Sequence, residues 1–145
     1  MPNREPLLFD THAHLHDQAF DDDRGNVLIR ATENSVRGLV TVGTNLDTSV
    51  AAIDVAKLYD GIWASVGIHP HHSKDWDVAT LARMPVLARE PEVVAVGEIG
   101  LDFFRDLSPR ELQREAFAAQ LALAEQLALP VIVHSLMVVV LLLSQ

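Results

Sequence analysis

The chain has 145 residues, 49% of them hydrophobic, which is enough for one globular domain with a buried core. Its net charge of -9 excludes a broad electrostatic grip on duplex DNA, but not a small phosphate-bearing substrate held by metal ions. Because it has no cysteine, disulfides, thiolate catalysis and cysteine-ligated zinc are excluded, and a reducing cytoplasm is favoured. The first six residues have no apolar signal core, so we expect no export signal.

Apolar runs typical of buried strands alternate with segments of helical spacing along the chain. The predicted strands are residues 7–10, 38–42, 62–66, 93–96 and 131–133. The predicted helices between them cover residues 27–34, 48–58 and 78–88, the last weakened by Pro85. A fourth helix is the clearest, because Ser108 fits its N-cap, Pro109 its first turn and Glu111 a capping box.

Strands that are apolar throughout and joined by helices predict an α/β fold with parallel strands covered on both faces. Such a fold is either a doubly wound sheet or a barrel. No glycine-rich loop follows the first predicted strand, which argues against a dinucleotide-binding or P-loop fold.

Polar residues recur where the predicted strands end. The set comprises His12 and His14 after the first strand, His69 and His71 after the third, Glu98 after the fourth and His134 after the fifth. In a parallel α/β barrel all of these ends meet at one mouth, where such enzymes place their active sites. This recurrence predicts a single site assembled from distant segments.

Three of the strand ends carry residue types that bind metal ions. His12 and His14 are two apart, so on a strand both imidazoles point to one side and can reach one ion. Glu98 ends an apolar run, where a lone carboxylate would be costly to bury unless a metal ion compensated it. Each residue alone has an ordinary alternative: surface histidines, a loop glutamate beside Arg105, or a hydrogen-bonded core histidine at His134. Their shared position favours metal ligation.

The third strand end is less specific. His69 and His71 flank Pro70, and they fit contacts with a substrate phosphate, support of a neighbouring ligand, or a solvated loop. We assign them to substrate binding. His16 and the acidic run at residues 21–23 are expected to have no role in the chemistry.

Four segments together resemble the motifs of the TatD family of metal-dependent hydrolases, in the same order along the chain. They are Phe9-Asp10-Thr11-His12-Ala13-His14-Leu15, Gly67-Ile68-His69-Pro70-His71, Gly97-Glu98-Ile99-Gly100-Leu101-Asp102-Phe103 and Leu129-Pro130-Val131-Ile132-Val133-His134-Ser135. The third is the most specific. The resemblance covers about residues 7 to 135.

The resemblance implies a TIM (β/α)8 barrel, of which about five of eight strands are present, and a hydrolase of the deoxyribonuclease type. It implies metal ligation by His12, His14, Glu98 and His134, with Glu98 bridging two divalent ions (Mg, Mn or Zn) and serving as the catalytic carboxylate. The expected partner is DNA or a small phosphodiester, with no membrane and no protein partner indicated. The alternatives are an amidohydrolase-type enzyme that cleaves C–N or ester bonds, and a fragment without turnover.

The chain departs from the family pattern after Ser135. Residues 136–145 form an apolar tail in place of the usual arginine and aspartate, and the later ligand histidine and the aspartate of the family are absent. We therefore expect residues 1–135 to be the N-terminal part of a barrel, followed by a divergent tail that is too short to span a membrane. An early stop or frame change is the leading explanation, and the tail predicts poor solubility.

Overall fold

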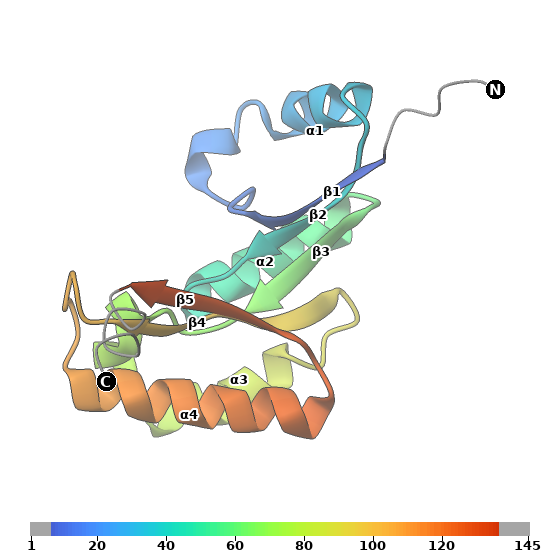
Figure 1. Cartoon of the computed structure of the whole chain (residues 1–145). Helices are drawn as coiled ribbons and strands as arrows, with labels where there is room; N and C mark the ends of the chain where they lie inside the picture. The colour runs from blue at the N-terminus through green and yellow to red at the C-terminus, as the bar shows by residue number, and fades with distance from the viewer. Residues whose placement is uncertain (1–6, 137–145) are drawn as a thin grey trace.

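The computed structural model describes residues 7–136, which form one five-stranded sheet and the helices that connect its strands (Figure 1). The strands are β1 (Leu8–Ala13), β2 (Val36–Val42), β3 (Ile62–Val66), β4 (Val93–Asp102) and β5 (Val131–Leu136). The α-helices are α1 (Arg24–Glu33), α2 (Leu46–Leu58), α3 (Val78–Leu87) and α4 (Arg110–Leu127), with short 3-10 helices η1 (Gln18–Phe20) and η2 (Pro70–Asp75). All five predicted strands and all four predicted helices are present.

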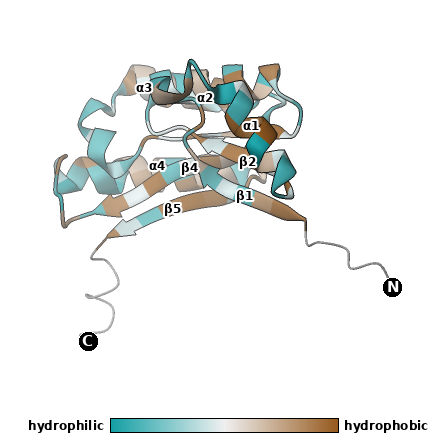
Figure 2. Cartoon of the chain, turned by 90° about the horizontal axis from the view of Figure 1, so that it is seen from above, coloured by the Kyte–Doolittle hydropathy of each residue, from teal (hydrophilic) through white to brown (hydrophobic). Residues whose placement is uncertain are grey.

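The strands lie in chain order, β1-β2-β3-β4-β5, and every neighbouring pair is parallel. In Figure 2 the four α-helices lie on one side of the sheet, as right-handed crossovers between successive parallel strands require. A sheet wound always in one direction, with its helices on one side, is an arc of a barrel, so the predicted partial TIM barrel is confirmed. A doubly wound sheet would have helices on both sides.

The core lies between the sheet and its helices. Leu39 of β2 and Val66 of β3 are buried in one cluster with Ile53 of α2, and Val96 of β4 packs with Ala124 of α4. Burial of apolar area stabilises this layer by about 25 cal/mol for each Å² removed from water. In the part of the chain described by the structure, no helix is both long and apolar enough to cross a bilayer. The apolar tail lies outside the described residues, apart from Leu136 at the end of β5.

One predicted helix start is wrong. The N-cap of α4 is Pro109, not Ser108. The hydroxyl of Ser108 instead donates to the carbonyl of His71 (2.8 Å) and accepts from the backbone N–H of Lys74 (3.1 Å). Because this hydroxyl is needed to hold η2 against the start of α4, it is not available to cap the helix. The proline in α3 was expected to weaken that helix, and α3 nonetheless continues through Pro85 to Leu87.

Close packing of β4 against β5 depends on glycine. Gly100 has φ 143°, and a Cβ at this position would collide with the carbonyl oxygen of His134. We expect Gly100→Ala to lower the free energy of unfolding by roughly 1–3 kcal/mol, because the strands would have to separate. Urea denaturation measures the change. Gly25→Ala is the matched control, since nothing lies within 4 Å of an added Cβ there; an equal loss in both variants would contradict the explanation.

Candidate metal centre

The polar residues at the strand ends lie together, with Glu98 between histidines from both edges of the sheet. Its Oε2 lies 3.4 Å from Nε2 of His12, and its Oε1 lies 3.1 Å from Nδ1 of His134. His12 belongs to β1 and His134 to β5. Three strands separate β1 from β5 in the sheet order, so these contacts require the sheet to curve until its edges approach one mouth.

Backbone bonds at the strand ends hold Glu98 in place. The N–H of Glu98 donates to the carbonyl of Gly43 (3.0 Å), which directly follows β2. The N–H of His69 donates to the carbonyl of Thr44 (2.8 Å). These bonds tie the ends of β3 and β4 to the end of β2, so the carboxylate is fixed by main chain as well as by its side-chain contacts. With 12% of its side chain exposed, Glu98 is largely shielded from water and needs positive charge nearby.

One ring nitrogen of His14 is already committed to the main chain. Nδ1 of His14 lies 2.9 Å from the carbonyl oxygen of Val42, and only a protonated Nδ1 can make this bond. The neutral ring therefore keeps its lone pair on Nε2, which is the form that binds metal ions. A backbone carbonyl behind a histidine is a common way to orient a metal ligand. The ligand atoms of His12, His14 and Glu98 all lie within 4.8 Å of one another, so these donors fit one ion.

The contacts of His134 indicate that a second ion could bind on the other side of Glu98. Its Nε2 lies 3.2 Å from Oδ2 of Asp102, which assigns the proton to Nε2 and the lone pair to Nδ1. That lone pair faces Oε1 of Glu98 at 3.1 Å. Two acceptors this close repel unless a cation or a proton lies between them. His134 and Glu98 therefore also suit a shared ion.

Asp102 is a residue of this cluster that sequence reasoning missed. Its side chain is completely buried, and its Oδ1 accepts from the backbone N–H groups of Phe104 (3.1 Å) and Arg105 (2.8 Å). Its Oδ2 lies 2.6 Å from Nε2 of His71 in addition to its contact with His134. Burial by itself raises the pKa of Asp102, but the bond from Arg105 and the contacts with both histidines outweigh it and lower the pKa to about 2. A carboxylate at the end of a buried strand was the signal, and it was used only for Glu98.

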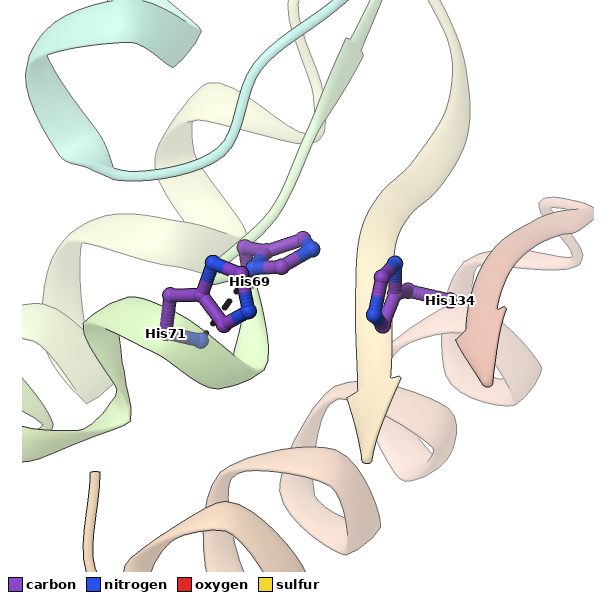
Figure 3. A group of neighbouring side chains, drawn as sticks. All are labelled: His69, His71 and His134. Carbon is purple, nitrogen blue, oxygen red and sulfur yellow. Dashed lines mark hydrogen bonds between the residues drawn. The ribbon is translucent and has the colours of Figure 1, made fainter. Parts of the chain in front are cut away.

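His69 differs from the proposed ligands in the way its ring is bonded. Its Nδ1 accepts from the backbone N–H of His71 (3.1 Å), the bond drawn in Figure 3, so the proton of the neutral ring is on Nε2. Burial, followed by the nearby His134 and His71 rings, lowers the pKa of His69 to about 3. Near neutral pH the residue is thus an uncharged donor that presents Nε2–H, and that nitrogen lies 3.7 Å from Oε1 of Glu98.

A second set of possible ligands is formed by His69, His71 and His134, whose imidazoles point toward one space in Figure 3. Their ligand atoms also lie within 4.8 Å of one another. Metal binding by His69 through Nε2 would move its proton to Nδ1 and break the bond from His71 N–H. The hydrogen bonds therefore favour His69 as a donor and leave His134 free to bind an ion beside Glu98.

Helix α4 supports the loops that carry these histidines. The side-chain amide of Gln120 is buried and bonds both backbone groups of Ile68, accepting from its N–H (2.7 Å) and donating to its carbonyl (3.2 Å). Gln113, also buried, accepts from the N–H of Asp102 (2.9 Å). His16, expected to have no role in the chemistry, has its Nδ1 2.9 Å from Oγ1 of Thr41.

Acid should destabilise this cluster. The pKa of His69 is 6.5 in an unfolded chain and about 3 in the folded protein, so the unfolded state binds more protons between these values. The contribution of His69 to the free energy of unfolding is therefore fully present above pH 6.5. It is lost toward pH 3, by up to about 1.4 kcal/mol per pH unit. Asp102, at 3.8 unfolded and about 2 folded, adds a loss in the same direction below pH 3.8.

The measurement is urea denaturation in EDTA at pH 7.0 and 4.5, for the parent and for His69→Asn. The parent should lose stability and the variant should lose less of it. Equal acid sensitivity of the two proteins would contradict the assignment to His69.

Comparison of the chain with known proteins identifies its family. The model of the family described as TatD related DNase matches residues 9–139, which include every residue of the site described above. The chain belongs to the TatD-related DNase family.

Several TatD relatives are similar over most of the chain. The 3'-5' ssDNA/RNA exonuclease TatD of Klebsiella pneumoniae (strain 342) is 44% identical over 127 residues, covering 88% of this chain and 48% of the relative. The protein of the same name in Escherichia coli (strain K12) is 43% identical, covering 88% and 49%. The uncharacterized metal-dependent hydrolase YabD of Bacillus subtilis (strain 168) is 40% identical, covering 89% and 51%. The chain spans about half the length of the curated relatives it matches.

Solved TatD structures share the fold. The TatD homologue YJJV of Escherichia coli K12 superposes with a TM-score of 0.83 at 32% identity, covering 90% of this chain and 51% of that protein. A TatD family hydrolase of Entamoeba histolytica gives the same TM-score at 24% identity, which supports the fold alone.

Proposed function

We propose that this chain supplies the N-terminal half of the active site of a metal-dependent phosphodiesterase that hydrolyses DNA with two divalent ions. The observation that carries the proposal is the position of Glu98, whose two oxygens face His12 on one side and His134 on the other. A carboxylate placed in this way suits a bridge between two ions. Membership of a metal-dependent hydrolase family supports the same conclusion.

The donor set assigns residues to each ion. His12, His14 and Glu98 would hold the first, and Glu98 with His134 would hold part of the second, whose coordination needs further ligands. Imidazole and carboxylate together suit Zn²⁺ or Mn²⁺, and a site richer in oxygen would suit Mg²⁺. When bound, such ions acidify water and stabilise the charge that develops on a phosphodiester. Glu98 is the catalytic carboxylate of the proposal, because it fixes the spacing of the two positions.

His69 and His71 are proposed to bind the substrate phosphate. The Nε2–H of His69 points into the site, and a neutral donor of this kind can bond a phosphate oxygen without competing for the ions. His71 donates its Nε2–H to Asp102, so its Nδ1 can donate to a phosphate oxygen only when the ring carries both protons. Both residues lie beside Glu98 and His134, where a phosphodiester bound to the ions would be placed.

The proposed substrate is a phosphodiester in single-stranded nucleic acid, the material named for the exonuclease relatives. We further propose that residues 1–135 form the N-terminal part of the hydrolase barrel, with a divergent tail after them. The cytoplasmic location expected from the composition stays a prediction.

The test is hydrolysis of bis-p-nitrophenyl phosphate and of a labelled single-stranded oligonucleotide, with Mn²⁺ and with EDTA. We expect turnover that requires the ion and no turnover on a panel of cyclic amides. Activity only on the amides would replace the phosphodiesterase with a C–N hydrolase. Mn²⁺ binding without turnover on either substrate would identify this chain as a metal-binding fragment.

A further inference from the structure

The segment after β4 has two exposed side chains whose backbone is fixed to the candidate metal centre. The N–H groups of Phe104 and Arg105 both donate to Oδ1 of Asp102, and the other oxygen of this carboxylate contacts His71 and His134. The connection between β4 and α4 lies on the side to which the arrowhead of β5 points in Figure 1. Phe104 and Arg105 therefore start from the rim of the mouth.

Phe104 is an aromatic ring left in water. Its relative exposure is 64%, and within residues 7–136 it has no ring or cation–π contact. Its neighbour Phe103 differs, because the guanidinium groups of Arg110 and Arg114 lie 4.9 and 5.0 Å from the centre of its ring. The ring of Phe104 is therefore free to stack on a ligand, while its backbone is held in place by Asp102.

Arg105 is a cation without a partner in the described part of the chain. Its backbone bonds Asp102, whereas its exposed side chain has no hydrogen bond or ion pair there. The carboxylate next to it, Asp106, is paired with Arg110 at 3.0 Å and is thereby neutralised. The next two arginines along the chain are also paired, Arg110 with Asp106 and Arg114 with Glu111 at 3.7 Å, so Arg105 is the free cation of this segment among the described residues.

We infer that Phe104 and Arg105 form a strand-binding platform, on which Phe104 stacks an unpaired base and Arg105 contacts a backbone phosphate of single-stranded nucleic acid. The inference rests on the proposed function, because the platform would present a phosphodiester to the centre beside it. A stacked ring needs a base with a free face, so the platform selects single strands over duplex. With a net charge of -9, the chain must bind by a few local contacts of this kind.

The experiment measures binding without turnover. A fluorescein-labelled twelve-residue oligothymidylate is titrated with the full chain in EDTA, at several salt concentrations, and followed by anisotropy. Phe104→Ala should weaken binding about 10-fold, whereas Phe104→Tyr should retain it, because base stacking needs only the ring. Arg105→Ala should reduce the salt dependence by about one phosphate contact. A duplex of the same length should bind more weakly than the single strand.

The controls lie at the opposite ends of the strands. Leu58→Ala removes an exposed apolar side chain at the end of α2, and Arg37→Ala removes an exposed cation at the start of β2. Both should bind like the parent. Equal binding by the parent, Phe104→Ala and Arg105→Ala overturns the platform, as does an absence of oligonucleotide binding in the parent. A change in sedimentation of Phe104→Ala without a change in binding also overturns it and assigns the ring to self-association.

The two proposals fail separately. Hydrolysis of bis-p-nitrophenyl phosphate together with variants that bind normally would leave the phosphodiesterase in place and remove the platform. Binding that depends on Phe104, in a chain that neither binds Mn²⁺ nor hydrolyses phosphodiesters, would leave the platform and remove the proposed chemistry.

Discussion

Glu98→Gln is expected to lose at least about 100-fold in phosphodiester turnover, equivalent to about 2.7 kcal/mol of barrier, together with most of the affinity for Mn²⁺. Glutamine has the shape of glutamate but no charge, and it has one acceptor oxygen in place of two. Its single oxygen cannot be a ligand both beside His12 and beside His134, as the two oxygens of Glu98 can. Calorimetric titration of the metal-free protein with Mn²⁺ measures the affinity, and bis-p-nitrophenyl phosphate measures the turnover.

The variant should keep its stability in EDTA, because it removes a largely buried charge that lacks a cation. Glu90→Gln is the matched control: Glu90 pairs with Lys57 at 2.8 Å, on a different part of the surface. It should bind Mn²⁺ like the parent. If Glu98→Gln bound Mn²⁺ with unchanged affinity, Glu98 would not be a ligand and the two-ion proposal would fail.

Asp102→Asn is expected to weaken Mn²⁺ binding about 10- to 100-fold, although Asp102 touches no proposed ion. Asparagine can still accept the backbone bonds from the following turn through its oxygen, but it then turns an NH₂ group toward His71 and His134. Two donors would face each other there. To relieve this, His134 must move its proton from Nε2 to Nδ1, and the lone pair that faces Glu98 is lost.

The same substitution should lower the free energy of unfolding by about 1–3 kcal/mol, the range for a buried polar group left unsatisfied. Thermal denaturation in EDTA gives this value independently of the metal. Asp77→Asn is a suitable control, because Asp77 caps α3 by accepting from the N–H of Thr80 (2.7 Å), and asparagine caps equally well. Unchanged Mn²⁺ affinity in Asp102→Asn would show that the carboxylate serves stability alone.

The fold could be predicted well because its signals are local. Each strand is a short apolar run, and the helices carry apolar residues at helical spacing, so the order of elements follows from periodicity. Parallel strands also place their carboxyl ends together, which is why His12, Glu98 and His134 could be assigned to one site before any distance was known. The helix start at Ser108 was wrong because a contact with His71 and Lys74, distant in sequence, competes for the same hydroxyl.

The sequence by itself determined that His12, His14, Glu98 and His134 gather at the mouth, since residue type and position at a strand end do not depend on tertiary detail, but it did not assign Asp102 to the same cluster. Only the tertiary structure decided what each gathered residue can do. The lone pair of His134 faces Glu98 because Asp102 holds the opposite nitrogen, and His69 is a donor because the His71 backbone occupies its Nδ1. Ring nitrogens are distinguished by their hydrogen-bond partners, and those partners come from chain segments that pattern and spacing cannot place to within an ångström.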